Sequence, residues 1–251
     1  MRTGRRKLWI AAAVLGLLVV LVAGCAFLPN IAITLPTLPT ASTAPTASTA
    51  PVAPTGDAAT ALATLPVKGR APKTGYARTQ FGPAWADTDR NGCDQRNDVL
   101  ARDLTKTTLK GGRCVVLTGT LKDPYTGHTI SFVRGQGTSE AVQIDHVVAL
   151  SDAWQTGAQQ LDAAVRQRLA TDPLNLLAVD GPTNQSKSDG DAATWLPPNK
   201  SFRCSYVARQ VAVKAKYHLW VIPAERDAVA RVLAGCPGQA LPADSGIPGA
   251  G

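Results

Sequence analysis

This chain of 251 residues has few of the side chains that bind zinc. It contains only three histidines, His128, His146 and His218, and no two of its five cysteines stand in a Cys-x-x-Cys spacing. Structural zinc sites usually combine such closely spaced ligands. The sequence therefore gives no indication of a zinc knuckle, and any reaction that needs a histidine must use one of these three.

Charged residues are almost absent from Pro29–Pro66. This region is rich in Thr, Ala, Pro and Ser and contains near-repeats of Thr-Ala-Ser-Thr-Ala-Pro. With few large apolar side chains this region cannot bury a core, so we predict a disordered stalk over residues 25–68. The Gly- and Pro-rich tail at 237–251 has a similar character and is also expected to be disordered. The folded part is therefore expected at 69–236, a length that suits one domain with a core.

The N-terminus is basic and continues as an almost wholly apolar run, Leu8–Val22, which ends at Ala23-Gly24-Cys25. This order is typical of an export signal. The small residues before Cys25 resemble a bacterial lipobox, so we expect residues 1–24 to be a lipoprotein signal peptide and Cys25 to carry lipid. The alternative is an uncleaved transmembrane anchor, since the apolar run is nearly long enough to span a bilayer. In the favoured interpretation the protein is exported and anchored in the cell membrane, facing outside the cytoplasm.

The other cysteines are Cys93, Cys114, Cys204 and Cys236. An even number of cysteines outside the cytoplasm indicates disulfides. Four cysteines allow three connectivities, and proximity along the chain favours the pairs Cys93–Cys114 and Cys204–Cys236.

The net charge of +8 is smaller in a chain that starts at Cys25, because the first 24 residues carry four basic residues and no acidic ones. The remaining 22 basic and 18 acidic residues give +4, which is compatible with a polyanionic partner but not diagnostic of one. One predicted helix is rich in basic residues. It would present either a phosphate-binding face or a solvated face, through Lys200, Arg203, Arg209, Lys214 and Lys216.

Local patterns predict an α+β domain. Runs of β-branched and apolar residues predict strands at 114–121, 129–133, 142–148 and 176–179. Helical spacing and capping signals predict helices at 97–104, 151–155, 160–169, 201–217 and from Pro223 onward. The segment 184–194 is expected to hold one more helix, after the fourth strand. The third and fourth strands are expected to pair with each other.

The chemically most informative residues are Asp145 and His146, which end an apolar run. Asn175 occupies a turn before the next apolar run, and Asn184 lies in a polar stretch beyond it. A neutral imidazole is the side chain whose ordinary pKa suits a general base near neutral pH. Carboxylate and amide oxygens are hard ligands suited to Mg²⁺. Each residue alone could be an ordinary turn or loop residue, but together and in this order they indicate a catalytic site.

This order resembles the HNH endonucleases, and in particular the group typified by the C-terminal nuclease domain of GmrSD-type restriction enzymes, including small exported bacterial members. The likeness extends from about Asp87 to Cys236 and is densest at 123–127, 144–154, 172–189 and 195–198. The resemblance implies a ββα-metal core, in which an antiparallel hairpin precedes a helix. We expect additional helices, a short antiparallel sheet and disulfides around that core.

The resemblance also implies roles for single residues. His146 would activate water, and Asn175 would brace the loop that orients it. Asp145 and Asn184 would hold Mg²⁺ or Mn²⁺, although many HNH enzymes carry histidine in place of this last asparagine. Lys187 could contact phosphate.

The implied function is metal-dependent hydrolysis of phosphodiester bonds in nucleic acid, with DNA favoured over RNA, by a monomer. The products would carry a 5′ phosphate and a 3′ hydroxyl. Two alternatives come from other classes: a non-catalytic cell-surface binding module on the same fold, and a stalked structural lipoprotein. The complete set of site residues argues against both.

A second pattern, the Asp-Thr-Asp-Arg-Asn-Gly run at 87–92, resembles the opening of an EF-hand calcium loop. Asp98 stands at the twelfth position, where glutamate is usual. Calcium would then be held at Asp87, Asp89 and Asn91. The alternative is an Asx-rich turn that leads into a disulfide.

Overall fold

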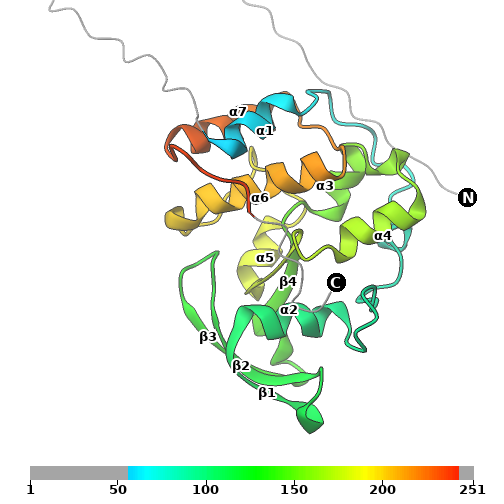
Figure 1. Cartoon of the computed structure of the whole chain (residues 1–251), viewed down its shortest axis with the longest axis vertical. Coiled ribbons are helices and arrows are strands. Elements are labelled where there is room, and N and C mark those ends of the chain that lie inside the picture. The colour runs from blue at the N-terminus through cyan, green and yellow to red at the C-terminus, as the bar shows by residue number, and fades with distance from the viewer. Residues whose placement is uncertain (1–55, 243–251) are drawn as a thin grey trace, which may run out of the picture. The chain divides into compact units, whose positions relative to one another are not determined.

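The computed structural model describes residues 56–242 (Figure 1). The expected signal peptide at 1–24, the lipidated Cys25, the stalk as far as residue 55 and the tail from residue 243 lie outside the described residues. Within the described part of the chain, no helix has both the length and the apolarity that crossing a membrane requires.

Two strands and one helix form the centre of the domain. Strand β4 (Val142–His146) pairs antiparallel with β5 (Leu176–Asp180), and α5 (Gly181–Lys187) follows directly. The register places His146 opposite Leu176 at the end of the ladder. The predicted pairing is confirmed, and the histidine stands where the strand ends.

Helix α5 begins earlier than predicted because its first residues start a helix well. The Asp180 carboxylate accepts a hydrogen bond from the main-chain N–H of Thr183 at 2.8 Å, and Pro182 occupies the first turn. At Gly181, a Cβ atom would lie 2.0 Å from the Glu140 carbonyl oxygen, so only glycine fits. The helix therefore stands directly against the start of β4, which fixes the position of its polar side chains.

The connection between β4 and β5 contains two helices, α3 (Leu150–Gln155) and α4 (Ala163–Thr171). After α5, the chain continues into α6 (Arg203–Lys216) and α7 (Pro223–Ala234). Figure 1 shows these last two helices at the end of the domain away from the strands β1, β2 and β3. These four helices had been predicted with boundaries that differ by at most three residues.

A separate antiparallel sheet contains β1 (Leu104–Leu109), β2 (Val116–Lys122) and β3 (Thr129–Val133), in that order. Helix α2 (Gln95–Asp103) leads into β1 and packs on the same apolar cluster. Strand β1 was not predicted because its sequence is mostly polar and only Leu104 is buried.

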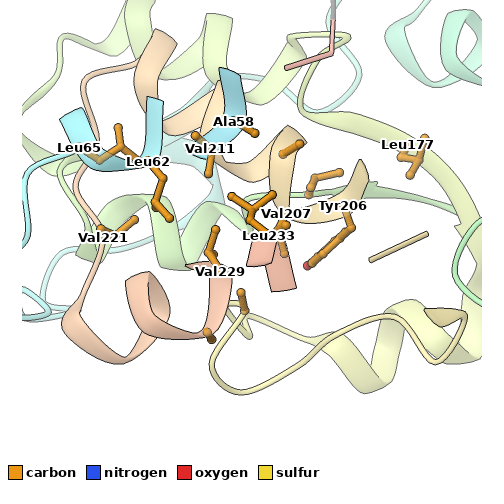
Figure 2. Packing of buried hydrophobic residues seen from close by; sticks show 14 of the residues in the cluster. Ala58, Leu62, Leu65, Leu177, Tyr206, Val207, Val211, Val221, Val229 and Leu233 are labelled. Carbon is orange, nitrogen blue, oxygen red and sulfur yellow. The ribbon is translucent and has the colours of Figure 1, made fainter. Parts of the chain in front are cut away.

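A further helix, α1 (Asp57–Thr64), corrects the predicted boundary of the stalk. Ala58, Leu62 and Leu65 recur at helical spacing, are buried, and belong to the apolar cluster formed with α6 and α7 (Figure 2). The Ala- and Thr-rich composition concealed this apolar face. The Ala58 amide also donates to the Gln239 carbonyl at 3.1 Å, so the domain extends beyond 69–236 at both ends.

Both predicted disulfides are present, Cys93–Cys114 and Cys204–Cys236. The first joins the segment before α2 to the segment before β2, and the second joins α6 to the end of α7. Their sequence separations of 21 and 32 residues correspond, in the loop-entropy model, to roughly 3–4 kcal/mol of stabilisation each.

Candidate active site

Asp145, His146 and Asn184 line one cleft, with a volume of about 510 Å³. The cleft lies at the end of β4, beside the first residues of α3 and the side chains of α5. Its other lining side chains include three cations and an aromatic ring, from Lys73, Arg78, Arg96 and Trp85. A general-base candidate, two oxygen ligands and a positive surface therefore meet in one place.

The His146 ring is fixed by one nitrogen. Its Nε2 lies 2.8 Å from the Ala170 carbonyl oxygen. Because a carbonyl can only accept, the neutral ring carries its proton on Nε2, and Nδ1 keeps the lone pair. Burial lowers the His146 pKa to about 4. The hydrogen bond to the Ala170 carbonyl opposes this shift, and the charges of Arg78 and Lys187 add smaller contributions that lower the pKa further. At neutral pH the ring is therefore uncharged and able to accept a proton.

Asn175 is fully buried and bonds to two segments that follow the histidine in the chain. Its Oδ1 accepts from the Val148 amide at 2.8 Å, and its Nδ2 donates to the carbonyls of Val148 and Leu169, each at 3.3 Å. Leu169 directly precedes Ala170, whose carbonyl binds the imidazole. The asparagine thus connects the segment after His146 with the segment that orients the His146 ring.

Asp145 is buried, and both of its oxygens have partners. Oδ1 accepts from Lys187 Nζ at 2.9 Å, and Oδ2 accepts from the Tyr125 hydroxyl. Burial raises the pKa of the Asp145 carboxyl above its ordinary value, while Lys187 and Tyr125 lower it. A carboxylate oxygen has two lone pairs, so these bonds still leave Asp145 able to bind a cation from the cleft.

Lys187 does not occupy the position expected of a phosphate contact. Its side chain is fully buried, and Nζ also donates to the His146 carbonyl at 2.8 Å. The structure makes Lys187 the internal partner of Asp145, which joins the end of α5 to the end of β4. The sequence around Lys187 is polar, so nothing in it indicates that this lysine is buried.

Asn184 reaches the cleft from α5, and its Nδ2 donates to Gln143 Oε1 at 2.9 Å. This bond directs the nitrogen to β4 and leaves the amide oxygen as the atom that suits a cation. Within residues 56–242, no three His, Cys, Asp or Glu side chains are grouped as a metal site. The two candidate ligands in the cleft, Asp145 and Asn184, are a carboxylate and an amide, so they do not form a group of that kind.

Three cleft residues joined by hydrogen bonds had no predicted role in the site. Asp189 Oδ2 accepts from Lys73 Nζ and from Ser151 Oγ, each at 3.0 Å. Ser151 and Asp189 fall in the segments where the family likeness is densest, which is the one signal that points to them. Lys73 lies outside those segments, so only the fold brings it to the site.

The basic helix, α6, does not form one phosphate-binding face. Lys214 is buried, with Nζ 2.6 Å from Glu225 Oε1 and 3.1 Å from Asp152 Oδ2. Arg209 donates to the Leu174 carbonyl at 2.9 Å. These cations are used inside the domain, and the basic side chains of the cleft come from residues 73–96 instead.

An antiparallel hairpin that ends in Asp-His, a buried asparagine behind the histidine and a following helix with a second asparagine define a nuclease domain of the HNH class. The chain belongs to the family described as GmrSD restriction endonucleases, C-terminal domain, whose model matches residues 94–232. It is also similar to an "Uncharacterized secreted protein" of Arthroderma benhamiae, with 36% identity over 181 residues that cover 71% of this chain and 84% of that protein. No solved structure matches the chain.

Proposed function

We propose that this protein is an exported, divalent-metal-dependent endonuclease that hydrolyses phosphodiester bonds in nucleic acid, with DNA as the expected substrate. Family membership supports the nuclease class, and the description of the related protein as secreted supports export. The observation that carries the proposal is the His146 ring, uncharged and held by Ala170, in a cleft that also contains two hard oxygen ligands.

His146 acts as the general base. Nδ1 takes a proton from water as the water oxygen forms a bond to phosphorus, and the bond from phosphorus to the 3′ oxygen breaks. The departing 3′ oxygen takes up a proton from a second water molecule, and the imidazolium later returns its own proton to the solvent. The products carry a 5′ phosphate and a 3′ hydroxyl. Asn175 is a positioning residue, because it is fully buried and joins the segment after His146 to the segment whose carbonyl binds the ring.

The oxygens of Asp145 and Asn184 suit Mg²⁺ or Mn²⁺, since they are hard donors from neighbouring elements on one cleft. A bound cation of this kind stabilises negative charge on the phosphate and on the leaving oxygen. Lys187 compensates the buried charge of Asp145 and keeps the carboxylate in place.

The cations on the cleft supply the contact with the substrate backbone. Arg78 lines the same cleft as His146 and suits a phosphate group, since a guanidinium can donate two hydrogen bonds at once. Arg96 also lines the cleft, but one of its nitrogens already donates to the carbonyls of Ser139 and Val142 at 3.4 and 3.1 Å, so it adds positive charge and only its remaining N–H groups can reach a phosphate. Trp85 offers a ring on which an unpaired base could stack. These contacts carry no sequence information, so we expect cleavage with little sequence selectivity.

The test is incubation of the purified full chain with plasmid DNA and with RNA in Mg²⁺, Mn²⁺ or EDTA. The proposal predicts cleavage with either metal and none in EDTA, with DNA cut faster than RNA. Cleavage that persists in EDTA would contradict the metal requirement. If no nucleic acid is cut with either metal, the better account is a cell-surface binding module on the same fold.

A further inference from the structure

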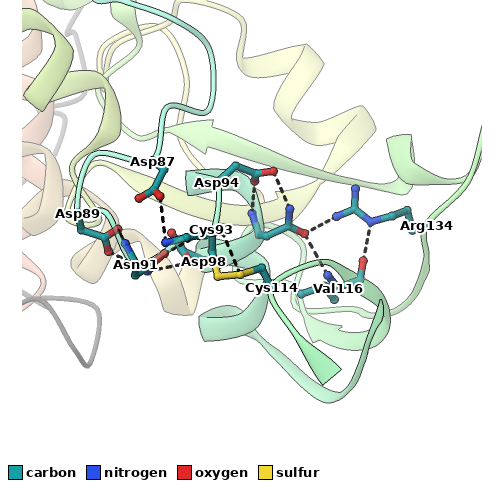
Figure 3. Close-up of a disulfide and its surroundings, with 11 residues drawn as sticks. Asp87, Asp89, Asn91, Cys93, Asp94, Asp98, Cys114, Val116 and Arg134 are labelled. Carbon is teal, nitrogen blue, oxygen red and sulfur yellow. Dashed lines mark hydrogen bonds between the residues drawn. A yellow bond between two sulfur atoms is a disulfide. The ribbon is translucent and has the colours of Figure 1, made fainter. Parts of the chain in front are cut away.

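The segment before α2 has a concentration of acidic side chains that the nuclease chemistry does not use. Asp87, Asp89, Asp94 and Asp98 fall within a short stretch together with Asn91 (Figure 3). Asp94 is the N-cap of α2 and accepts from the Asn97 amide at 2.8 Å. The other three aspartates have no helix end to cap and no ion pair among the described residues.

Asp98 is the most unusual member of the group. The residue is only 8% exposed, and its Oδ2 has no hydrogen-bond partner within the described part of the chain. Its Oδ1 accepts from Asn91 Nδ2 at 3.3 Å, and the same nitrogen donates to Asp89 Oδ2 at 3.0 Å. Asn91 Nδ2 therefore bridges two carboxylates and holds them close together, and one of the two has a buried oxygen for which the described residues supply no donor.

The pKa of Asp98 shows that this arrangement is electrostatically unfavourable for the charged carboxylate. Burial raises the Asp98 pKa to about 6, and the charges of Asp89, Asp87 and Asp94 add to the rise, against a lowering by the Asn91 hydrogen bond. An unpartnered buried carboxylate is unfavourable. A bound cation would supply the missing partner and offset the repulsion among the aspartates.

The backbone of the loop turns its oxygen-bearing side chains inward. Gly92 donates its amide to Asp87 Oδ2 at 3.0 Å, Asn91 donates its amide to Asp89 Oδ1 at 3.2 Å, and the Cys93 amide donates to Asn91 Oδ1 at 2.7 Å. Gly92 has φ 87°, a conformation that favours glycine. The oxygens thus come from positions 1, 3, 5 and 12 of a single loop.

We propose that this loop binds one Ca²⁺ ion through Asp87, Asp89, Asn91, the Cys93 carbonyl and Asp98. Calcium accepts six to eight oxygen ligands in flexible geometry, including amide and main-chain oxygens, so the site does not depend on a group formed by acidic side chains alone. The ion has a structural role, because the loop lies between Trp85 and Arg96, which both line the catalytic cleft. Calcium holds that wall of the cleft in place.

The test is thermal unfolding of the full chain in excess Ca²⁺ and in EGTA, with Mg²⁺ as the comparison ion. Asp98→Asn removes the charge but keeps an oxygen for Asn91, and it relieves repulsion, so this variant is expected to fold. Asp162→Asn is the matched control, because Asp162 is exposed and makes no cap hydrogen bond. Asn184→Ala serves as a control for binding at the catalytic cleft.

At a Ca²⁺ concentration about 100 times Kd, the wild-type Tm should rise by roughly 5–10 °C, with a smaller rise in Mg²⁺. Asp162→Asn and Asn184→Ala should show the same rise, and Asp98→Asn should show almost none. An equal Tm in Ca²⁺ and EGTA for the wild type would overturn the proposal. So would a full response in Asp98→Asn, or a response lost only in Asn184→Ala, which would place the ion in the cleft.

Discussion

At the scale of single residues, Asp145 and Lys187 form an ion pair that water hardly reaches. Their side chains are 6% and 0% exposed, and their charged atoms lie 2.9 Å apart. Lys187 also donates to the His146 carbonyl, so the pair fixes the main chain at the proposed general base. The charge of the lysine thus acts on the site from inside the protein.

Replacing Lys187 with methionine should leave Asp145 as an uncompensated buried charge. Removing one partner of a buried pair typically costs about 3–5 kcal/mol. We therefore expect Lys187→Met to lower the free energy of unfolding by that amount in urea denaturation. The double variant Asp145→Asn, Lys187→Met is the control and should recover most of the lost free energy of unfolding. If Lys187→Met alone is as stable as the wild type, the ion pair contributes little to stability.

At the scale of elements, buried charges join three helices that are distant in sequence. Lys214 on α6 contacts Asp152 on α3 and Glu225 in the first turn of α7. Glu225 is 1% exposed. Burial raises the Glu225 pKa to about 7, Asp152 adds to the rise, and Lys214 opposes it. Lys214 thus faces two buried carboxylates, and Asp152 has a second cationic partner in Arg70 at 2.9 Å.

This arrangement predicts how stability depends on pH. The folded chain keeps the Glu225 proton up to about pH 7, whereas the unfolded chain releases it near the ordinary value of 4.5. Since the folded state binds more protons in that window, the free energy of unfolding should fall as pH rises through it. Glu225→Gln should flatten this slope in urea unfolding between pH 5 and 8. Glu140→Gln, at an exposed glutamate, should keep the wild-type slope; equal slopes in all three proteins would contradict the assignment.

Elements with a strong local signal were predictable from the sequence. The runs at 129–133 and 176–179 are apolar or β-branched, and both form strands close to those bounds. Strand β1 and helix α1 were missed because their stability comes from partners elsewhere in the chain. β1 pairs with β2 through a mostly polar sequence, and α1 buries only a narrow face.

At the scale of the whole molecule, the candidate site residues Asp145, His146, Asn175 and Asn184 could be named from the sequence, because they lie on β4 and α5 or directly before β5. The basic wall of the cleft could not be predicted from the sequence. Its side chains come from residues 73–96, and only the folded chain brings that segment beside β4. Local patterns carry no information about such long-range placement.

The N-terminal region carries the predicted export signal and lipidation site, and it offers a separate prediction. If residues 1–24 are a lipoprotein signal, intact-mass spectrometry of membrane-extracted protein should show a diacylglyceryl group on Cys25. Cys25→Ser should abolish this modification without changing nuclease activity, since Cys25 precedes the described domain. An unmodified Cys25 with the apolar segment still attached would favour a transmembrane anchor.

The central claim is that His146 is the general base, and one comparison tests it most directly. Plasmid cleavage in Mg²⁺ should be measured for the wild type, His146→Ala and His128→Ala, each confirmed as folded by circular dichroism. His128 is exposed and does not line the cleft, so its replacement should leave the rate unchanged. The account predicts that His146→Ala cuts about 10²–10⁴ times more slowly, the usual contribution of a positioned base. A folded His146→Ala variant that cuts as fast as the wild type would contradict it.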